Sequence, residues 1–106
     1  LQAALYTLDK TAPADGTLDA DELNAVLEIS AWAHAEWVRI HPFANGNGRT
    51  ARLLANAILL RYGLPPAVRT RPRPGNPYGA AGEAAMRGDY KPMVTILRRM
   101  LRAMMQ

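Results

Sequence analysis

Two long helical patterns meet at a short glycine-rich segment in the middle of this 106-residue sequence, and their order limits the possible folds. Apolar residues recur every three or four positions over residues 23–38, which predicts a long helix that Pro42 ends. A second such pattern predicts a helix over about residues 49–62, with Gly63 as its C-cap. The glycine-rich residues 42–48 therefore form a loop between two helices. The inward positions that we expect in the second helix are Leu53, Leu54, Ala57 and Leu60.

The remaining periodic segments also predict helices. They cover residues 1–9, about residues 78–87 and about residues 92–104, and Asp19 or Thr17 can cap the long helix at its start. No segment alternates like a β-strand over five residues. We therefore predict an all-α fold, a compact helical bundle with the glycine-rich loop between its two central helices.

Composition excludes several classes of site. The sequence has no cysteine and only two histidines, which excludes disulfides, zinc–thiolate sites, iron–sulfur clusters, cysteine nucleophiles and a multi-histidine metal cage. Hydrophobic residues make up 49% of the chain, but no apolar stretch approaches the roughly 18 residues of a membrane span. We expect one domain over residues 1–106, in a cytoplasmic bacterial protein with no membrane partner. Because the first residue is Leu1, we expect the chain to be a piece of a longer protein.

Acidic and basic residues are divided unevenly between the two ends of the chain. Residues 1–36 contain seven acids and one base, whereas residues 37–106 contain twelve bases and two acids. Eleven of the thirteen bases are arginine, whose guanidinium group can hold a phosphate with two hydrogen bonds. A basic half indicates an anionic ligand, which could be a nucleotide, a nucleic acid or an acidic protein surface. A GC-rich genome that uses arginine in place of lysine would give the same composition.

The central loop has the features of an anion site. Gly46 and Gly48 allow the backbone to approach a ligand closely and to turn its N–H groups inward. The free N–H groups at the start of the following helix, together with the helix dipole, favour a negative charge there. An isolated Gly-X-Gly sequence is usually only a turn, so the prediction of an anion site depends on the side chains around the two glycines.

Three side chains add chemistry to this loop. Arg49 and Arg52 are three residues apart, so they lie on one helix face and can clamp phosphate oxygens. His41 enters the loop from the other side, and an imidazole can take a proton from an attacking hydroxyl. Each could instead be a solvated surface residue or a helix cap. Together, a base, an anion site and an arginine clamp are what phosphoryl or nucleotidyl transfer requires.

These residues resemble a known family. The sequence HPFANGNGRTAR at 41–52 resembles the signature loop of Fic domains, enzymes that mostly transfer AMP from ATP to a hydroxyl group of a protein. The residues AWAHAEWVRI at 31–40, GLPP at 63–66 and MRGD at 86–89 resemble the segments that flank this loop in the family. The similarity covers about residues 20–103. It implies an all-helical Fic-type fold and a protein adenylyltransferase with ATP as donor.

The resemblance implies a role for each matched residue. His41 would deprotonate a Ser, Thr or Tyr hydroxyl of the target protein, which would then attack the α-phosphorus of ATP and release pyrophosphate. Arg49 would hold the distal phosphates, and Arg52 would assist the phosphate network or pair with an acid elsewhere. The phosphate cradle and the anchor of the loop would be Gly46, Asn47, Gly48 and Phe43.

One position departs from the family pattern. Asn45 stands where the family has Asp or Glu to bind Mg²⁺, and an amide oxygen can bind this ion but brings no negative charge. We therefore expect weak Mg²⁺ binding. The departure leaves open a different donor, such as UTP, a phosphate donor or a phosphocholine donor. It also leaves open a catalytically weak module that only binds a nucleotide or a partner.

Partners follow from the same resemblance. We expect a target protein with a hydroxyl side chain, and an inhibitor that is a separate chain or lies outside this sequence, because no Ser/Thr-x-x-x-Glu-Gly/Asn motif is present. Residues 10–17 are too short for the target-docking hairpin of the family. A homodimer through the last helix is left open. Nucleic-acid binding by the basic half has no recognition motif to support it.

Some other side chains have predicted structural roles. We expect His34 to be packed or hydrogen-bonded beneath the loop, and Tyr78 is a weak candidate for an adenine pocket. The run Arg-Thr-Arg-Pro-Arg at residues 69–73 is expected at the surface. The methionines that we assign to the core are Met86, Met93, Met100 and Met104.

Overall fold

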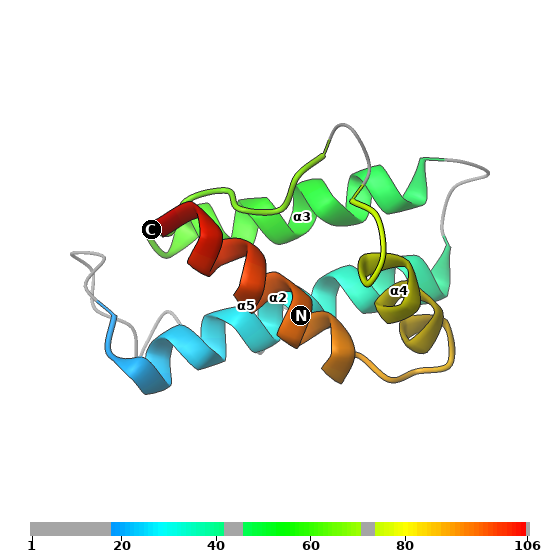
Figure 1. Cartoon of the computed structure of the whole chain (residues 1–106), viewed down its shortest axis with the longest axis horizontal. Helices are drawn as coiled ribbons and strands as arrows, with labels where there is room; N and C mark the ends of the chain where they lie inside the picture. The colour runs from blue at the N-terminus through cyan, green and yellow to red at the C-terminus, as the bar shows by residue number, and fades with distance from the viewer. Residues whose placement is uncertain (1–17, 42–45, 71–73, 106) are drawn as a thin grey trace.

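In the computed structural model, the described residues are 18–41, 46–70 and 74–105, and they form four helices (Figure 1). These helices are α2 (Ala20–Ile40), α3 (Asn47–Arg61), α4 (Tyr78–Met86) and α5 (Lys91–Met105). α2 packs against each of the other three, and α4 also contacts α5. This part of the chain contains no strand, so the predicted all-α fold is confirmed. The helix expected over residues 1–9 lies outside the described residues.

α2 begins where the sequence predicts. Asp19 is its N-cap, and the Oδ1 atom of this residue accepts a hydrogen bond of 2.8 Å from the backbone N–H of Glu22. In return, the Glu22 side chain accepts the backbone N–H of Asp19 at 3.2 Å. This capping box satisfies two N–H groups that helix geometry leaves without a partner. At the other end the helix stops after Ile40, and the backbone N–H of His41 donates to Trp37 O at 2.9 Å.

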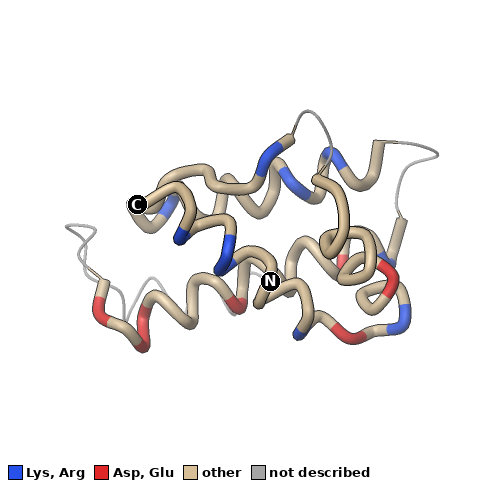
Figure 2. Tube along the Cα trace, in the orientation of Figure 1, with Lys and Arg blue, Asp and Glu red and all other residues tan. Residues whose placement is uncertain are grey.

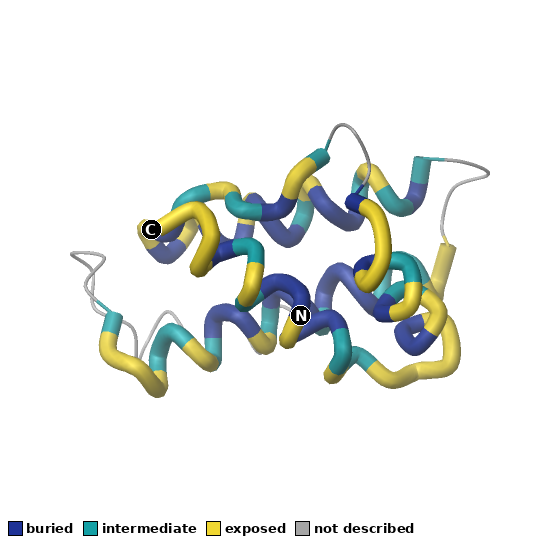
Figure 3. The backbone as a smooth tube through the Cα atoms, in the orientation of Figure 1, coloured by how far each residue is buried: buried dark blue, intermediate teal, exposed yellow. Residues whose placement is uncertain are grey.

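The core forms where the other three helices pack on α2. Figure 3 shows the buried backbone segments running along α2 and along the facing side of α3. Small residues such as Ala31 and Ala55 are fully buried, which lets these two helices approach closely. The largest apolar side chains with almost no exposed surface are Leu27, Leu59, Met93, Leu97, Val26 and Val68.

The inward face of α3 differs from the prediction. Leu53 and Leu60 are 53% and 57% exposed, and Ala57 is exposed too, so three of the four expected inward positions are wrong. Arg52 and Asn56 are buried instead. A count of apolar residues assigns the leucines to the core, but the buried face of α3 includes the two polar side chains, which hydrogen-bond to other parts of the chain. The apolar residues that α3 does bury are Ala51, Ala55, Ile58 and Leu59.

The start of α3 also differs from the prediction. The helix begins at Asn47 and not at Arg49, with Gly46 as its N-cap, so Asn47 and Gly48 belong to the first helical turn and not to the loop. Gly46 has a φ of 79°, a conformation that is open to glycine at little cost. This early start brings the first backbone N–H groups of the helix beside the glycines.

α4 and α5 lie within one residue of their predicted bounds. The methionine prediction is only partly right: Met93 is fully buried and Met100 is half-buried, but Met86 and Met104 are exposed. Regularly spaced residues share one face only when they belong to the same helix. Met86 is the last residue of α4, whereas the other three methionines belong to α5. Arg98 of α5 donates to Asn24 Oδ1 at 2.8 Å and so ties α5 to α2.

The charges keep their uneven distribution in three dimensions. Figure 2 shows acidic residues along α2, whereas α3, α5 and the segment between α3 and α4 carry mainly Lys and Arg. Among the described residues, Arg39 and Glu36 form an ion pair of 2.8 Å on the surface of α2. None of the described helices has an apolar stretch long enough to cross a membrane.

Candidate functional site

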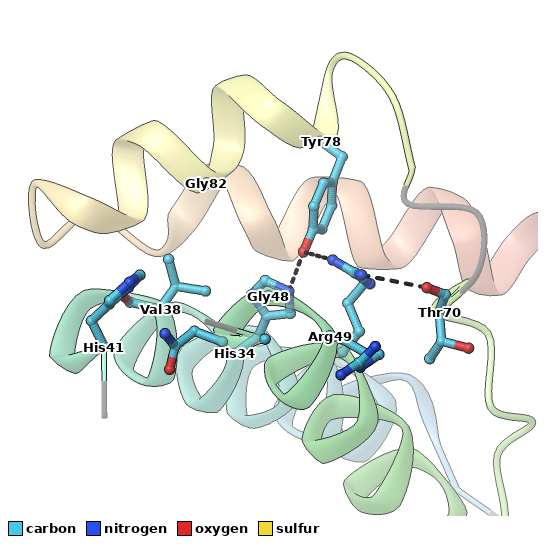
Figure 4. Close-up of a pocket in the computed structure, with 11 residues that line it drawn as sticks. His34, Val38, His41, Gly48, Arg49, Thr70, Tyr78 and Gly82 are labelled. Atoms are coloured by element: carbon cyan, nitrogen blue, oxygen red, sulfur yellow. Dashed lines mark hydrogen bonds between the residues drawn. The ribbon is translucent and has the colours of Figure 1, made fainter. Parts of the chain in front are cut away.

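A hollow of about 600 Å³ opens between the end of α2, the start of α3 and α4. Six predicted site residues line it, and the chain brings them together from two sides of the central loop (Figure 4). Phe43 and Asn45, which the sequence also singled out, lie outside the described residues. The residues that line the hollow are His34, Val38, His41, Gly46, Asn47, Gly48, Arg49, Arg52, Thr70, Tyr78 and Gly82.

His41 lies at the edge of the hollow in an unusual backbone conformation. It caps α2 with a φ of 56° and a ψ of 58°, in the left-handed region that non-glycine residues seldom adopt. Its Nδ1 lies 3.4 Å from the Val38 carbonyl oxygen. A carbonyl oxygen can only accept, so this contact favours the tautomer that has its proton on Nδ1 and the lone pair on Nε2. The local fold therefore presents an exposed imidazole whose Nε2 can take a proton.

The N-terminus of α3 forms the floor of the hollow. Among the described residues, no side chain caps this helix end. The glycines leave space for the arginines: a Cβ at Gly46 would lie 3.5 Å from Arg49 Nη2, and a Cβ at Gly48 would lie 3.2 Å from Arg52 Nη1. Backbone N–H groups at a helix start attract anions, and here two guanidinium groups fold over the same turn. The floor can therefore hold a multiply charged anion.

Arg52 is a buried cation with neutral partners. It is 5% exposed, its Nη1 donates to the Tyr78 hydroxyl at 3.3 Å, and its Nη2 donates to the Thr70 carbonyl oxygen at 3.4 Å. Its guanidinium carbon also lies 5.7 Å from the centre of the Tyr78 ring. The buried Nε atom has no hydrogen-bond partner. A pairing of Arg52 with an acid, one of the two expectations, is not found in the described part of the chain. A buried charge without a counter-charge costs free energy, which an anion in the hollow would recover.

Tyr78, which accepts a hydrogen bond from Arg52, also bonds to His34. The Nε2 atom of His34 lies 2.7 Å from the Tyr78 hydroxyl oxygen, and the two rings meet edge to face (Figure 4). The Tyr78 hydroxyl oxygen accepts from Arg52, and its bond to His34 Nε2 can run in either direction, as set by the tautomer of the imidazole. Burial, and after it the nearby charge of Arg52, lower the pKa of His34 from 6.5 to about 4. The expectation that His34 is packed or hydrogen-bonded is confirmed, and with this pKa the histidine is neutral at pH 7.

Tyr78 therefore has a role that sequence reasoning missed. The sequence indicates only an adenine contact for Tyr78, whereas its hydroxyl joins His34 of α2 to Arg52 of α3. These partners are 44 and 26 positions away along the chain, so no local pattern could reveal them.

Asn56 is a second residue that sequence reasoning missed. Its Nδ2 donates to the Val68 carbonyl oxygen at 2.8 Å, and its Oδ1 accepts the Val68 backbone N–H at 2.9 Å. This pair of bonds fastens the segment after α3 against the helix. Thr70, two residues further on, then lies where its carbonyl oxygen meets Arg52.

The described part of the hollow does not fit the Mg²⁺ ion that the family resemblance implies. No carboxylate lines it, and no group of three or more His, Asp or Glu side chains that could hold a metal occurs among the described residues. The sequence itself has no acid between Glu36 and Glu83. Mg²⁺ binds carboxylate and phosphate oxygens, so this protein would offer the ion little beyond a ligand's own phosphates.

These features describe a helical protein in which the start of α3 and two arginines line a hollow beside an exposed histidine. The sequence profile of the Fic/DOC family matches residues 2–59. The chain therefore belongs to the Fic/DOC family.

Several relatives of this chain are named as protein adenylyltransferases. Protein adenylyltransferase Fic of Nematostella vectensis is 44% identical over 73 residues, which are 69% of this chain and 17% of that protein. Protein adenylyltransferase fic-1 of Caenorhabditis briggsae is 40% identical over 94 residues, which are 84% of this chain and 18% of that protein. The fic-1 protein of Caenorhabditis elegans is 46% identical over 71 residues, 64% of this chain and 13% of that protein.

This chain thus spans less than a fifth of the length of these relatives. All three are animal proteins and give no support to the bacterial source expected from the sequence. No solved structure matches the chain significantly.

Proposed function

We propose that this chain is the core of a protein adenylyltransferase that transfers AMP from ATP to a Ser, Thr or Tyr hydroxyl of a target protein. The observation that carries the proposal is the meeting of His41, the α3 N-terminus, Arg49 and Arg52 at one hollow. The names of the relatives support the same activity.

In this proposal the triphosphate of ATP binds at the start of α3. The backbone N–H groups of Gly46, Asn47 and Gly48 surround the phosphates, since no side chain caps this helix among the described residues. Arg49, which is exposed at the rim of the hollow, holds the distal phosphates. Arg52 adds a fixed positive charge because Tyr78 and Thr70 hold its guanidinium group in place.

The transfer step uses the free lone pair of His41. The target hydroxyl gives its proton to Nε2 while its oxygen forms a bond to the α-phosphorus. The bond between the α-phosphorus and the bridging oxygen breaks, and pyrophosphate leaves with the electron pair. The developing negative charge lies next to the N–H groups and guanidinium groups of the hollow, which stabilise it most where water is excluded.

A second candidate is a nucleotide-binding module that transfers AMP poorly or uses another donor. The observation that favours it is the absence of any carboxylate from the described wall of the hollow. Without a bound divalent ion, fewer charges would stabilise the leaving pyrophosphate.

The test is a transfer assay with ATP labelled at the α- or the γ-phosphate. The full-length protein would be incubated with a lysate of its source cells, and His41→Ala would be compared with wild type after circular dichroism has established equal folding. AMP transfer predicts label from the α-phosphate that His41→Ala lowers at least about a hundredfold. Label from the γ-phosphate alone would indicate phosphate transfer. Tight ATP binding without any label would favour the second candidate.

A further inference from the structure

We infer that this hollow binds the nucleoside triphosphate in its metal-free form, and that Mg²⁺ does not strengthen the binding. The inference rests on the proposed function and deepens it, because it states which charge state of the ligand the protein selects. The family resemblance implies Mg²⁺, but the described side chains that line the hollow offer this ion no carboxylate.

The described wall of the hollow carries two arginines and no carboxylate. Arg49 and Arg52 are the ionised side chains among the described lining residues, and both belong to the first turns of α3. The helix start adds its own partial positive charge. His34 and Tyr78, which also line the hollow, are buried and hydrogen-bonded to each other, and neither is a carboxylate. A divalent cation placed here would be repelled by both guanidinium groups and would meet no carboxylate.

Arg52 favours the metal-free triphosphate over the Mg²⁺-bound form more strongly than an exposed arginine would. It is buried, it is bonded to two neutral oxygens, and its Nε has no acceptor. A phosphate oxygen would supply both the missing acceptor and the missing negative charge. A triphosphate without metal offers more negative charge and more free oxygens than the same triphosphate bound to Mg²⁺. The metal-free form therefore satisfies Arg52 better.

The shape of the hollow is compatible with such a ligand. Its volume of about 600 Å³ lies in the usual range for small-molecule pockets. Gly46 and Gly48 bring no side chains of their own to the floor, and an added Cβ would lie 3.5 Å from Arg49 Nη2 at Gly46 or 3.2 Å from Arg52 Nη1 at Gly48. The phosphates can therefore approach the backbone and both arginines at once, with no metal between them.

The test measures ATP binding to the full-length protein by isothermal titration calorimetry, once with excess EDTA and once with excess MgCl₂. We expect a Kd in EDTA that is equal to or lower than the Kd in MgCl₂. A lower Kd in MgCl₂ would overturn the inference while leaving the proposed function intact. If ATP bound under neither condition, the proposed function would fail as well, so the two failures are distinguishable.

Two arginine variants test whether Arg49 contributes to the binding of metal-free ATP. In EDTA, Arg49→Gln should raise the Kd for ATP about tenfold or more, because a charge-assisted contact to phosphate is lost. Arg99→Gln is the matched control, since this exposed arginine of α5 does not line the hollow, and its Kd should equal that of wild type. Because Arg49 is exposed, its replacement should not disturb folding. Equal Kd values for Arg49→Gln and wild type would overturn the inference.

Discussion

The Tyr78 hydroxyl oxygen lies 2.7 Å from Nε2 of His34, and this buried bond joins α4 to α2 beneath the anion pocket. The same oxygen accepts a bond from Arg52 of α3. One hydroxyl group therefore links three helices and holds the buried cation of the pocket. Its removal should affect both the stability of the fold and the binding of phosphates.

Tyr78→Phe tests this link. The variant keeps the ring but leaves His34 Nε2 without its partner and Arg52 without one acceptor, so it should lower the free energy of unfolding by about 1–3 kcal/mol. The Kd for ATP should rise because Arg52 loses part of its support. Urea unfolding and calorimetry would measure the two effects.

Tyr90→Phe is the control for that experiment, since Tyr90 packs at the edge of the core and does not line the hollow. It should leave the Kd for ATP unchanged. If Tyr78→Phe and Tyr90→Phe had equal effects on both quantities, Tyr78 would not be the link described above.

The buried His34 predicts a pH dependence of stability. The pKa of this histidine is about 4 in the folded protein because of burial and then of the charge on Arg52, against 6.5 as the ordinary value. Between these values the unfolded chain binds a proton that the folded chain does not, so stability is highest above pH 6.5 and falls as the pH falls toward 4. The expected loss between pH 7 and pH 5 is about 2 kcal/mol, measured by urea unfolding.

Two variants identify the histidine responsible. His34→Gln should remove this pH dependence, whereas His41→Ala should keep it, because His41 is exposed. Most carboxylates stay ionised down to pH 5, so they contribute little in this window. A flat stability profile of the wild type between pH 7 and pH 5 would show that His34 is not held neutral by its surroundings.

Sequence patterns were sufficient for the four described helices and for the residues that meet at the hollow. Apolar periodicity and the Asp19 cap predicted α2 closely, and His41, Arg49 and Arg52 lie within twelve residues, so their meeting at one pocket followed from local geometry. The face of α3 could not be predicted, because Arg52 and Asn56 are buried by bonds to Tyr78 and to Val68. Such partners lie on other elements, and a hydrophobicity pattern gives no information on them.

Gly48 should be needed for the position of Arg52. In Gly48→Ala the new Cβ would lie 3.2 Å from Arg52 Nη1, so the guanidinium group must shift by a few tenths of an ångström. We expect a higher Kd for ATP with little change in thermal stability, because alanine also favours the helix. Calorimetry and thermal unfolding monitored by circular dichroism would measure these effects.

Gly82→Ala is the matched control for that variant. This glycine lies inside α4 and also lines the hollow, but a Cβ there would meet nothing within 4 Å. The variant should be more stable than wild type by about 0.5–1 kcal/mol and should bind ATP as wild type does. If Gly82→Ala weakened ATP binding as much as Gly48→Ala, the effect at Gly48 would not come from Arg52.

Asn56 should stabilise the segment that leads to Thr70. Asn56→Ala leaves the N–H and the carbonyl of buried Val68 without partners, which should cost about 2–4 kcal/mol of unfolding free energy. ATP binding should also weaken, since Thr70 supports Arg52. Hydrogen exchange would show faster exchange of the Val68 amide in the variant. Unchanged exchange at Val68 would contradict the role of this pair of bonds.

Asn45→Asp should reverse the metal preference of the protein. Asn45 lies outside the described residues, but the sequence places it next to Gly46, at the position where the family resemblance implies an acid for Mg²⁺. A carboxylate there adds a ligand that Mg²⁺ favours and a negative charge that repels the metal-free triphosphate. The Kd for ATP should therefore rise in EDTA and fall in MgCl₂, by calorimetry on the same protein preparation. Asn45→Ala, which adds no charge, should keep the wild-type preference. If Asn45→Asp responded to MgCl₂ no more than Asn45→Ala, the lack of a carboxylate would not be the reason for the preference.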